Sequence, residues 1–388
     1  MLELVIDTEN TGAQRDHAHP FNLDNKCCLI GMKRHSPITK NIEYDDSPYG
    51  QEIKDVQDEI EFSRLVVAFN LKYDLHWLRR YGIRIPTSAR CFDVQLVWFI
   101  LRGQRLPFPS LDQVAEYYGL EKKLDVVKLE YWDKGLDTDD VPLDILTDYL
   151  KQDLEVTWQC YLKCNEELER ATPELQRTVS VALQDLVVLA DMEWNGMFFN
   201  AEKSERRGDA IADRIADIDS EIRVLTGCNS VNANSGDHIS AILYGGIIDV
   251  PVRQPFLFTY KDGRQVWKER WGKDSYSFDP LVKPPKGSEL AKLGYYSTST
   301  DTLKALQLPN KKAKQIVSLL LKRSGLEQQR STYFHGYPKQ MRKHNWNDGI
   351  MHSQLNQCVA RTGRLSSSKP NLQNAESGVK EMFETRFK

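Results

Sequence analysis

The first 170 residues alternate between strand-like and helix-like patterns, and this alternation restricts the fold more than any other feature. Short runs of apolar and β-branched residues predict strands at residues 2–8, 27–32 and 65–69. Helical patterns predict helices at residues 71–81, 93–101, 110–118 and 141–168. Strands that alternate with helices indicate an α/β domain.

Beyond residue 170 the sequence becomes mainly helical. Thr172, Pro173 and Glu174 form a typical helix start, and apolar residues follow at helical spacing. Further helices are predicted at residues 201–225, 299–306 and 311–321. Residues 245–296 interrupt this pattern with five prolines and a hairpin-turn sequence at Tyr260–Arg264. A chain of 388 residues with this change of character is expected to hold two or three domains.

Charge is distributed unevenly, although the net charge of the whole chain is only −3. Residues 1–170 carry a net −10, residues 171–252 a net −7, and residues 253–388 a net +14. A basic end with interleaved aromatic residues indicates a polyanionic partner such as a nucleic acid. The alternative is an ordinary solvated surface.

Composition argues against a membrane or secreted protein. No apolar run approaches the roughly 20 residues that a membrane helix needs, and the N-terminus lacks the pattern of a signal peptide. The seven cysteines are scattered without a CxxC pair, so neither a disulfide framework nor a zinc site is expected. We therefore expect a cytoplasmic protein.

Three short acidic motifs lie at the ends of predicted elements. Asp7 and Glu9 are two residues apart at the end of a strand, so their side chains point to the same face. Asn70 and Asp74 flank the turn after a later strand. Tyr149 and Asp153 are four residues apart on a helix and share one of its faces.

Carboxylates from three segments converge only where they hold cations, because unpaired buried charges are too costly. Asp7, Glu9, Asp74 and Asp153 are therefore candidate ligands of two Mg²⁺ or Mn²⁺ ions, which prefer oxygen ligands. Two such ions can assist an in-line phosphoryl displacement. Tyr149 would orient the attacking water. Taken singly, each motif is more typical of an ordinary feature: a common strand-end D-x-E, an acid at a helix start, or a surface pair.

Together, these motifs resemble those of the DEDDy class of 3′→5′ exonucleases, found in the proofreading domain of family A (DNA polymerase I-like) DNA polymerases. The resemblance implies an RNase H-like α/β fold and two-metal hydrolysis, with Asn70 contacting the nucleic acid. Ribonuclease D-like enzymes share the motifs, so these residues do not separate DNA from RNA as the substrate. The residues that carry the resemblance are Asp7, Glu9, Asn70, Asp74, Tyr149 and Asp153.

Residues 361–374 form a second motif, rich in groups that can contact phosphates and base edges. Gly363 permits close approach of the backbone. Composition alone is also compatible with a polar surface loop. The string resembles the T-G-R-L-S-S-x-x-P-N-L-Q-N segment of family A polymerases, in which Arg364 would reach the minor groove near the primer terminus. The resemblance implies DNA binding by Arg361, Thr362, Gly363, Arg364, Ser366, Asn371, Gln373 and Asn374.

Two further segments, residues 230–240 and 296–303, resemble parts of the thumb of this family. Most of the stretch at 246–295 between them is then an insertion, either a DNA or partner surface or an exposed hairpin. The domains predicted are an exonuclease at 1–170, a helical thumb region at 171–335 and the start of a polymerase palm at 336–388.

The metal-binding motifs of the polymerase palm do not occur in these residues, and nucleotidyl transfer needs metal ions held by carboxylates. We therefore expect proofreading hydrolysis, but not polymerisation, from this chain. Primer-template and single-stranded DNA 3′ ends are the expected substrates. The chain resembles phage-type members of the family, and the expected location is the cytoplasm of a bacterial or phage-infected cell. A second polypeptide would supply the fingers and remaining palm, unless the chain is a truncation. The alternatives are a freestanding DEDDy exonuclease acting on DNA or RNA and a non-catalytic DNA-binding subunit.

Overall fold

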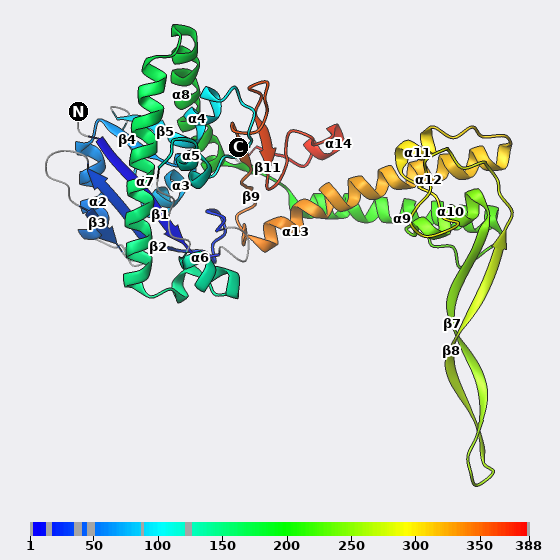
Figure 1. Ribbon diagram of the computed structural model, residues 1–388. Coiled ribbons are helices and arrows are strands. Elements are labelled where there is room, and N and C mark those ends of the chain that lie inside the picture. Colours follow the sequence, from blue (N-terminus) through cyan, green and yellow to red (C-terminus); the bar gives the residue numbers. More distant parts are fainter. Residues whose placement is uncertain are drawn as a thin grey trace. The chain divides into compact units, whose positions relative to one another are not determined.

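The computed structural model describes residues 3–12, 18–34, 41–44, 51–86, 89–120 and 126–385. It divides into two compact units (Figure 1). Unit 1 comprises Met1–Ala201 and Lys339–Lys388, and unit 2 comprises Glu202–Pro338. Within the described part of the chain, no helix combines the length and apolarity needed to cross a bilayer.

A five-stranded mixed sheet forms the centre of unit 1. β1 pairs in antiparallel fashion with β2, which pairs likewise with β3, whereas β4 and β5 continue the sheet in parallel on the other side of β1. The sheet confirms the α/β organisation predicted from the alternating pattern. In the order β3-β2-β1-β4-β5, the strands are Asn41–Tyr44, Cys27–Arg34, Glu3–Asn10, Leu65–Ala68 and Arg90–Asp93.

Helices pack against this sheet, and α3, α4, α5 and α7 lie close to the bounds expected from sequence, whereas α2, α6 and the strands β3 and β5 were not predicted. α7, the longest of them, packs against β1, β2 and β4, while α8 packs against α3, α4 and β5. The core is apolar, with Trp77 and Phe99 fully buried. The helices are α2 Gln51–Phe62, α3 Leu71–Arg80, α4 Val94–Leu101, α5 Leu111–Tyr117, α6 Val126–Glu130, α7 Leu143–Glu169 and α8 Pro173–Asn195, with two 3-10 turns at Trp132–Lys134 and Thr138–Asp140.

Gly31 of β2 allows α7 to approach the sheet closely. A Cβ atom at this position would lie 2.7 Å from Cγ of Leu150 and 2.9 Å from Cδ1 of Leu154. Both leucines belong to α7 and are buried. Because Gly31 lies opposite Asp7 in the sheet register, this contact fixes the height of α7 above the middle of β1.

The last part of the chain also belongs to unit 1, and it takes part in two small antiparallel pairs. β6 (Met197–Phe198) pairs with β9 (Ile350–Met351), and β10 (Gln354–Asn356) pairs with β11 (Ser366–Ser368). The short helix α14 follows at Ser377–Lys380. The two units are divided near residues 201 and 338, and the predicted domains at 1–170, 171–335 and 336–388 stay predictions.

A buried ion network explains why residues beyond 170 fold with the sheet. Glu193, near the end of α8, lies 2.6 Å from Nζ of Lys72 and 2.7 Å from Nε2 of His76, both on α3. It also accepts a hydrogen bond from the backbone N–H of Leu355 on β10. One carboxylate thus links α3, α8 and the C-terminal segment.

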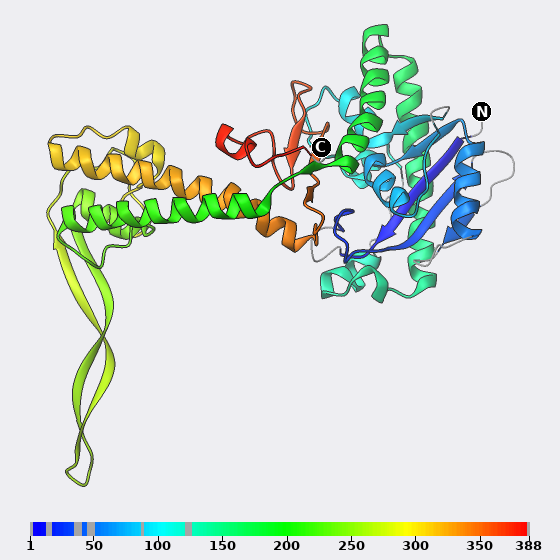
Figure 2. The ribbon, with the colours of Figure 1, turned by 180° about the vertical axis from the view of Figure 1, so that it is seen from behind.

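Unit 2 contains two long helices that run side by side, α9 (Ala201–Thr226) and α12 (Lys311–Gln329), as Figures 1 and 2 both show. Arg323 of α12 is buried and pairs with Asp219 of α9 at 2.5 Å. The shorter helices are α10 Gly236–Tyr244, α11 Thr300–Lys304 and α13 Gly336–Lys343, which runs past the unit boundary, with a π-helical turn at Arg330–Phe334.

The predicted excursion at 245–296 contains one long antiparallel ribbon. β7 (Gly246–Thr259) and β8 (Gln265–Phe278) pair along their entire length. The turn falls where the sequence predicts it, with the N–H of Tyr260 donating to the carbonyl of Arg264 at 2.8 Å.

Candidate functional site

The acidic pair of the first motif lies on the central strand of the sheet. β1 has neighbours on both sides, so its backbone is fixed by two ladders. Asp7 is half-buried, and Glu9 is buried. Their side chains share one face of β1, as the two-residue spacing predicts.

Helix α7 brings a third carboxylate to this pair. Carboxylate oxygens of Asp7, Glu9 and Asp153 all lie within 4.8 Å of one another. We call these three residues the acidic cluster. Asp153 is buried and follows Leu150 on α7, which packs against Gly31. The prediction that distant motifs meet in space is therefore confirmed for the first motif, with Asp7 and Glu9, and the third motif, with Asp153.

Asp74 lies beside the acidic cluster but is not part of it. Its side chain is buried, and its Oδ1 accepts a hydrogen bond from the hydroxyl of Thr8 at 2.8 Å. Burial, followed by the negative charge of Asp7, raises the pKa of the Asp74 carboxyl well above its ordinary value. A cation near Asp7 would favour the ionised form of Asp74.

Two residues of β1 that sequence reasoning missed hold Asp74 in place. Thr8 donates to Asp74, and the side-chain amide of Asn10 donates to the Thr8 hydroxyl at 3.0 Å. The same amide donates to the hydroxyl of Tyr73 at 3.2 Å. These bonds form because α3 packs against β1, and no local sequence pattern predicts that packing.

Asp93 is a third residue that was missed. It caps two helices, because its carboxylate accepts from the N–H of Leu71 at 2.8 Å and from that of Leu96 at 3.0 Å. Burial raises the pKa of Asp93 to about 6, although these N–H donors act in the opposite direction. An aspartate directly before an apolar helix is the usual sign of a cap at the start of that helix.

The remaining residues of the acidic motifs have clear positions. Asn70 is exposed and precedes α3 with φ 63°, a left-handed conformation that asparagine tolerates. Tyr149 is buried one turn before Asp153, and its ring meets that of Trp132 edge-on at 6.1 Å. The roles predicted for Asn70 and Tyr149 stay predictions.

The donor set of the acidic cluster suits a hard divalent cation. Three carboxylates within 4.8 Å of one another repel strongly unless a positive charge lies between them. Carboxylate oxygen is the preferred ligand of Mg²⁺ and Mn²⁺. The residues present therefore fit a metal centre.

The C-terminal motif lies on separate elements. Arg361 to Arg364 form the connection between β10 and β11, and their side chains are exposed. Gly363 has φ +72° and donates its N–H to the carbonyl of Ala360 at 3.0 Å, so the connection turns sharply here. The two arginines are therefore accessible to a ligand.

Serines and amides of this motif divide into structural and accessible groups. Ser367 is buried, and its hydroxyl lies 2.7 Å from that of Ser353. Ser366 is half-buried in β11, whereas Asn371, Gln373 and Asn374 are exposed. The N–H of Asn374 donates to Oδ1 of Asn371 at 3.2 Å, which holds this turn in shape. The DNA contacts predicted for the motif stay predictions.

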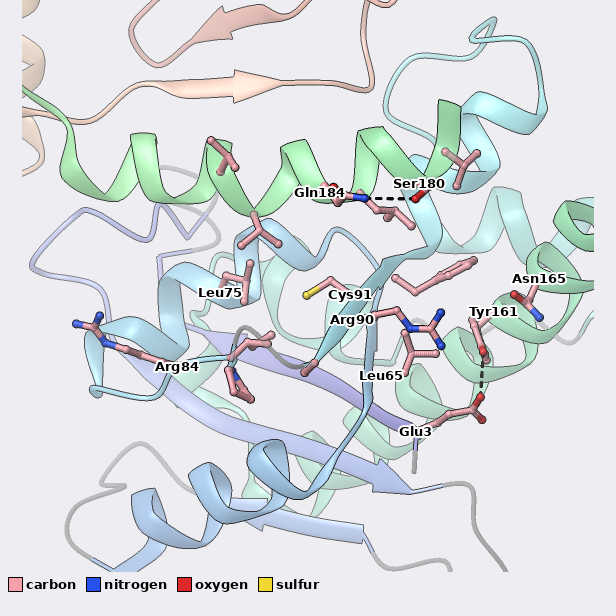
Figure 3. Close-up of a pocket in the computed structure, with 18 of the residues that line it drawn as sticks. Glu3, Leu65, Leu75, Arg84, Arg90, Cys91, Tyr161, Asn165, Ser180 and Gln184 are labelled. Carbon is pink, nitrogen blue, oxygen red and sulfur yellow. Dashed lines mark hydrogen bonds between the residues drawn. The ribbon is translucent and has the colours of Figure 1, made fainter. Parts of the chain in front are cut away.

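A pocket of about 1150 Å³ lies elsewhere in unit 1 (Figure 3). Its lining comes from β4, β5, α3, α7 and α8, and from Glu3 at the start of β1. Asp7 and Glu9 of the acidic cluster lie further along β1 than Glu3. None of the three residues of the cluster is among the described residues that line this pocket. The pocket is therefore distinct from the candidate metal centre.

Comparisons with known proteins point to one family. Residues 276–387 match DNA polymerase family A. DNA polymerase I of Synechocystis sp. is 27% identical over 329 residues, which cover 83% of this chain and 28% of that protein. DNA polymerase DpoZ of Salmonella phage PMBT28 is 25% identical over 404 residues, covering 98% of this chain and 56% of the phage protein.

A solved structure agrees at the level of fold. The POL domain of Pol1 from M. smegmatis, in complex with DNA primer-template and dNTP, superposes with a TM-score of 0.64 at 17% identity, covering 98% of this chain and 54% of that one. The chain spans between 28% and 56% of the length of the two curated relatives described above. Its sequence is similar to those of family A DNA polymerases.

Proposed function

We propose that this chain provides the exonuclease, the thumb and the first palm segment of a family A DNA polymerase. It would remove nucleotides from DNA 3′ ends by metal-dependent hydrolysis. The observation that carries this proposal is the acidic cluster, in which residues 7, 9 and 153 meet from two separate elements. The mixed sheet, with its acids on the central strand, supports an RNase H-like fold for residues 1–170.

Hydrolysis at this site would add water across the terminal phosphodiester. A bond forms between the water oxygen and phosphorus, the bond from phosphorus to the 3′ oxygen breaks, and that oxygen takes up a proton. A nucleoside 5′-monophosphate leaves. When bound, two Mg²⁺ or Mn²⁺ ions supply charge stabilisation at the phosphoryl oxygens and lower the pKa of the attacking water.

The chain's own residues prepare this reaction. Asp7, Glu9 and Asp153 would hold the ions, and Asp74 would contribute once a neighbouring cation favours its ionised form. Thr8 fixes the orientation of the Asp74 carboxylate. Tyr149, one turn before Asp153 on α7, would orient the water by its hydroxyl.

The exposed arginines and amides at 361–374 would hold the primer-template. Arg364 would contact the duplex near the primer terminus. Polymerisation would need fingers and palm residues that lie outside these 388 residues, supplied by a continuation of the chain or by a second polypeptide.

The nuclease proposal is tested with 5′-labelled single-stranded DNA and Mg²⁺. The wild-type chain should shorten the strand stepwise from its 3′ end, and EDTA should stop the reaction. Asp153→Asn should lower the rate by at least about 100-fold, because it removes one charge from the ligand set. Circular dichroism would verify that the variant is folded.

Asp148→Asn serves as the matched control, since Asp148 lies on the same helix with a side chain that is 83% exposed. It should leave the rate within twofold of wild type. Equal rates for Asp153→Asn and wild type would exclude the acidic cluster as the catalytic centre. A labelled RNA strand, degraded faster than DNA, would favour the freestanding ribonuclease instead.

A further inference from the structure

The β7–β8 ribbon of unit 2 carries exposed aromatic side chains. Its strands form 14 consecutive residue pairs, and only its base packs on α10, where Ile248 is buried. Trp267 and Trp271 are each 69% exposed and lie on the same face of the ribbon as Arg253 and Lys273. Figures 1 and 2 show the ribbon as a long twisted arm. An exposed surface of this kind is typical of an interaction site.

The two faces of the ribbon differ in how their charges are neutralised. One face carries Arg253 and Lys273, and each has a carboxylate partner on the opposite strand. Arg253 lies 3.1 Å from Glu269, and Lys273 lies 3.5 Å from Asp249. This face therefore has no surplus of positive charge.

Arg253 also lies over a ring, that of Trp271 at 5.2 Å, but the cations of the other face rest on aromatic rings without a carboxylate partner. Nζ of Lys268 lies 3.8 Å from the ring centre of Phe258, and Cζ of Arg270 lies 5.5 Å from that of Phe256. Neither cation has a salt-bridge partner among the described residues. A ring positions a cation without cancelling its charge. We call this the Lys268–Arg270 face.

The shape and charge of this face fit a duplex nucleic acid. A two-stranded ribbon is one of the elements that the major groove of DNA admits. Cations held by rings keep donors directed outward, where phosphates can accept them. The ribbon itself, residues 246–278, carries six basic and four acidic residues, a net charge of +2, which favours a polyanionic partner.

We propose that the β7–β8 ribbon is a DNA-binding arm, which holds duplex DNA through the phosphates that contact the Lys268–Arg270 face. This inference rests on the proposed function in one respect, because that function identifies DNA as the nucleic acid that the chain binds. It adds a contact surface in unit 2 to the binding residues predicted at 361–374.

The test measures the affinity of the full chain for a fluorescently labelled 30-base-pair duplex. EDTA is present, so that no hydrolysis occurs. The double variant Lys268→Ala/Arg270→Ala should bind about tenfold more weakly. The slope of log affinity against log salt concentration should fall by about two, because two phosphate contacts are lost. Circular dichroism and the midpoint of thermal unfolding should match the wild type.

Arg253→Ala/Lys273→Ala is the matched control, since it removes two cations from the opposite face of the same strands. It should stay within twofold of wild type. An equal loss in both double variants would contradict the assignment to one face. An equal loss on a 30-nucleotide single strand would contradict the choice of duplex DNA. Unchanged duplex binding together with altered sedimentation would assign the ribbon to self-association and overturn the proposal.

Exonuclease activity on a 12-nucleotide single strand separates this inference from the proposed function. Both double variants should retain the wild-type rate, because the acidic cluster is untouched. A wild-type chain that fails to hydrolyse DNA would refute the nuclease proposal, while the comparison of duplex affinities would still decide the role of the ribbon.

Discussion

Unit 1 and the ribbon of unit 2 use charge in opposite ways. In unit 1, charged groups meet in the interior: the side chains of Glu193 and His76 are 1% and 3% exposed. In the ribbon, Lys268 is half-buried and Arg270 exposed, and both rest on aromatic rings without a salt-bridge partner among the described residues. Buried charge is costly unless its partners are fixed, whereas exposed charge remains available to a ligand. The first arrangement suits a preorganised reaction site, and the second suits the capture of a polyanion.

The largest effect on stability is expected from Glu193→Ala. This change leaves Lys72 and His76 without their shared carboxylate in a buried position. The free energy of unfolding should fall by about 3 kcal/mol, measured by urea denaturation of the full chain. Asp191→Ala removes a more exposed acid two residues earlier on α8 and should cost less than about 1 kcal/mol.

The same network predicts the direction of the pH dependence. Burial lowers the pKa of His76, although Glu193 opposes this effect. Burial alone would raise the pKa of Glu193, but the hydrogen bond with His76 and the charge of Lys72 lower it overall. Groups with lowered pKa values contribute stability at higher pH, so the difference in unfolding free energy between wild type and His76→Gln should shrink as the pH falls below about 6.5. The raised pKa values of Asp74 and Asp93 act in the opposite direction, but they do so in both proteins. A difference that grows on acidification would contradict this description.

Gly31→Ala tests whether the acidic cluster depends on the close approach of α7. The new Cβ would lie 2.7 Å from Leu150, so α7 must shift and carry Asp153 away from Asp7. Exonuclease activity should fall about tenfold with little unfolding. Gly378→Ala, at a position in unit 1 with open space around it, should leave the rate unchanged. Equal rates for the two variants would show that the cluster tolerates displacement of α7.

Arg364→Ala tests whether an exposed charge of unit 1 also serves ligand binding, as proposed for the exposed charges of the ribbon. Affinity for a primer-template should fall about fivefold, measured by fluorescence anisotropy, while hydrolysis of short single strands stays unchanged. Arg170→Ala, at the exposed end of α7, is the control for general charge loss. An equal loss of binding and hydrolysis would contradict a role for Arg364 in holding the duplex.

The smallest effect concerns the ion pair between Arg253 and Glu269. A double-mutant cycle with both alanine variants should give an interaction energy of no more than about 0.5 kcal/mol in urea unfolding. An energy above about 1 kcal/mol would mean that this face of the ribbon is not the solvent-exposed surface described above.

Local patterns were sufficient to predict much of the fold. The strand at Cys27–Arg34 and the helix at Leu143–Glu169 lie within a few residues of their predicted bounds, because their apolar spacing is regular. The small pairs β6–β9 and β10–β11 were not predicted. The strands β6 and β9 are far apart in sequence, and β10 and β11 are only three residues long. No local periodicity predicts either pairing.

The candidate site was predicted in part for the same reason. Asp7, Glu9 and Asp153 lie at spacings that a strand and a helix convert directly into a shared location. The double cap by Asp93 and the bond from Thr8 to Asp74 depend on how α3 meets β1 and β5. The boundary near residue 201 depends on the pairing of Glu193 with α3. Such contacts arise only when elements pack, so sequence alone does not reveal them.

The most direct test of the central claim is a crystal of the full chain grown with Mn²⁺, examined by anomalous diffraction. We expect a peak within about 2.2 Å of carboxylate oxygens of Asp7, Glu9 and Asp153. The peak should be absent from crystals of the Asp7→Asn/Asp153→Asn variant. A map with no peak at this cluster, at Mn²⁺ concentrations that support hydrolysis, would contradict the metal centre on which the account depends.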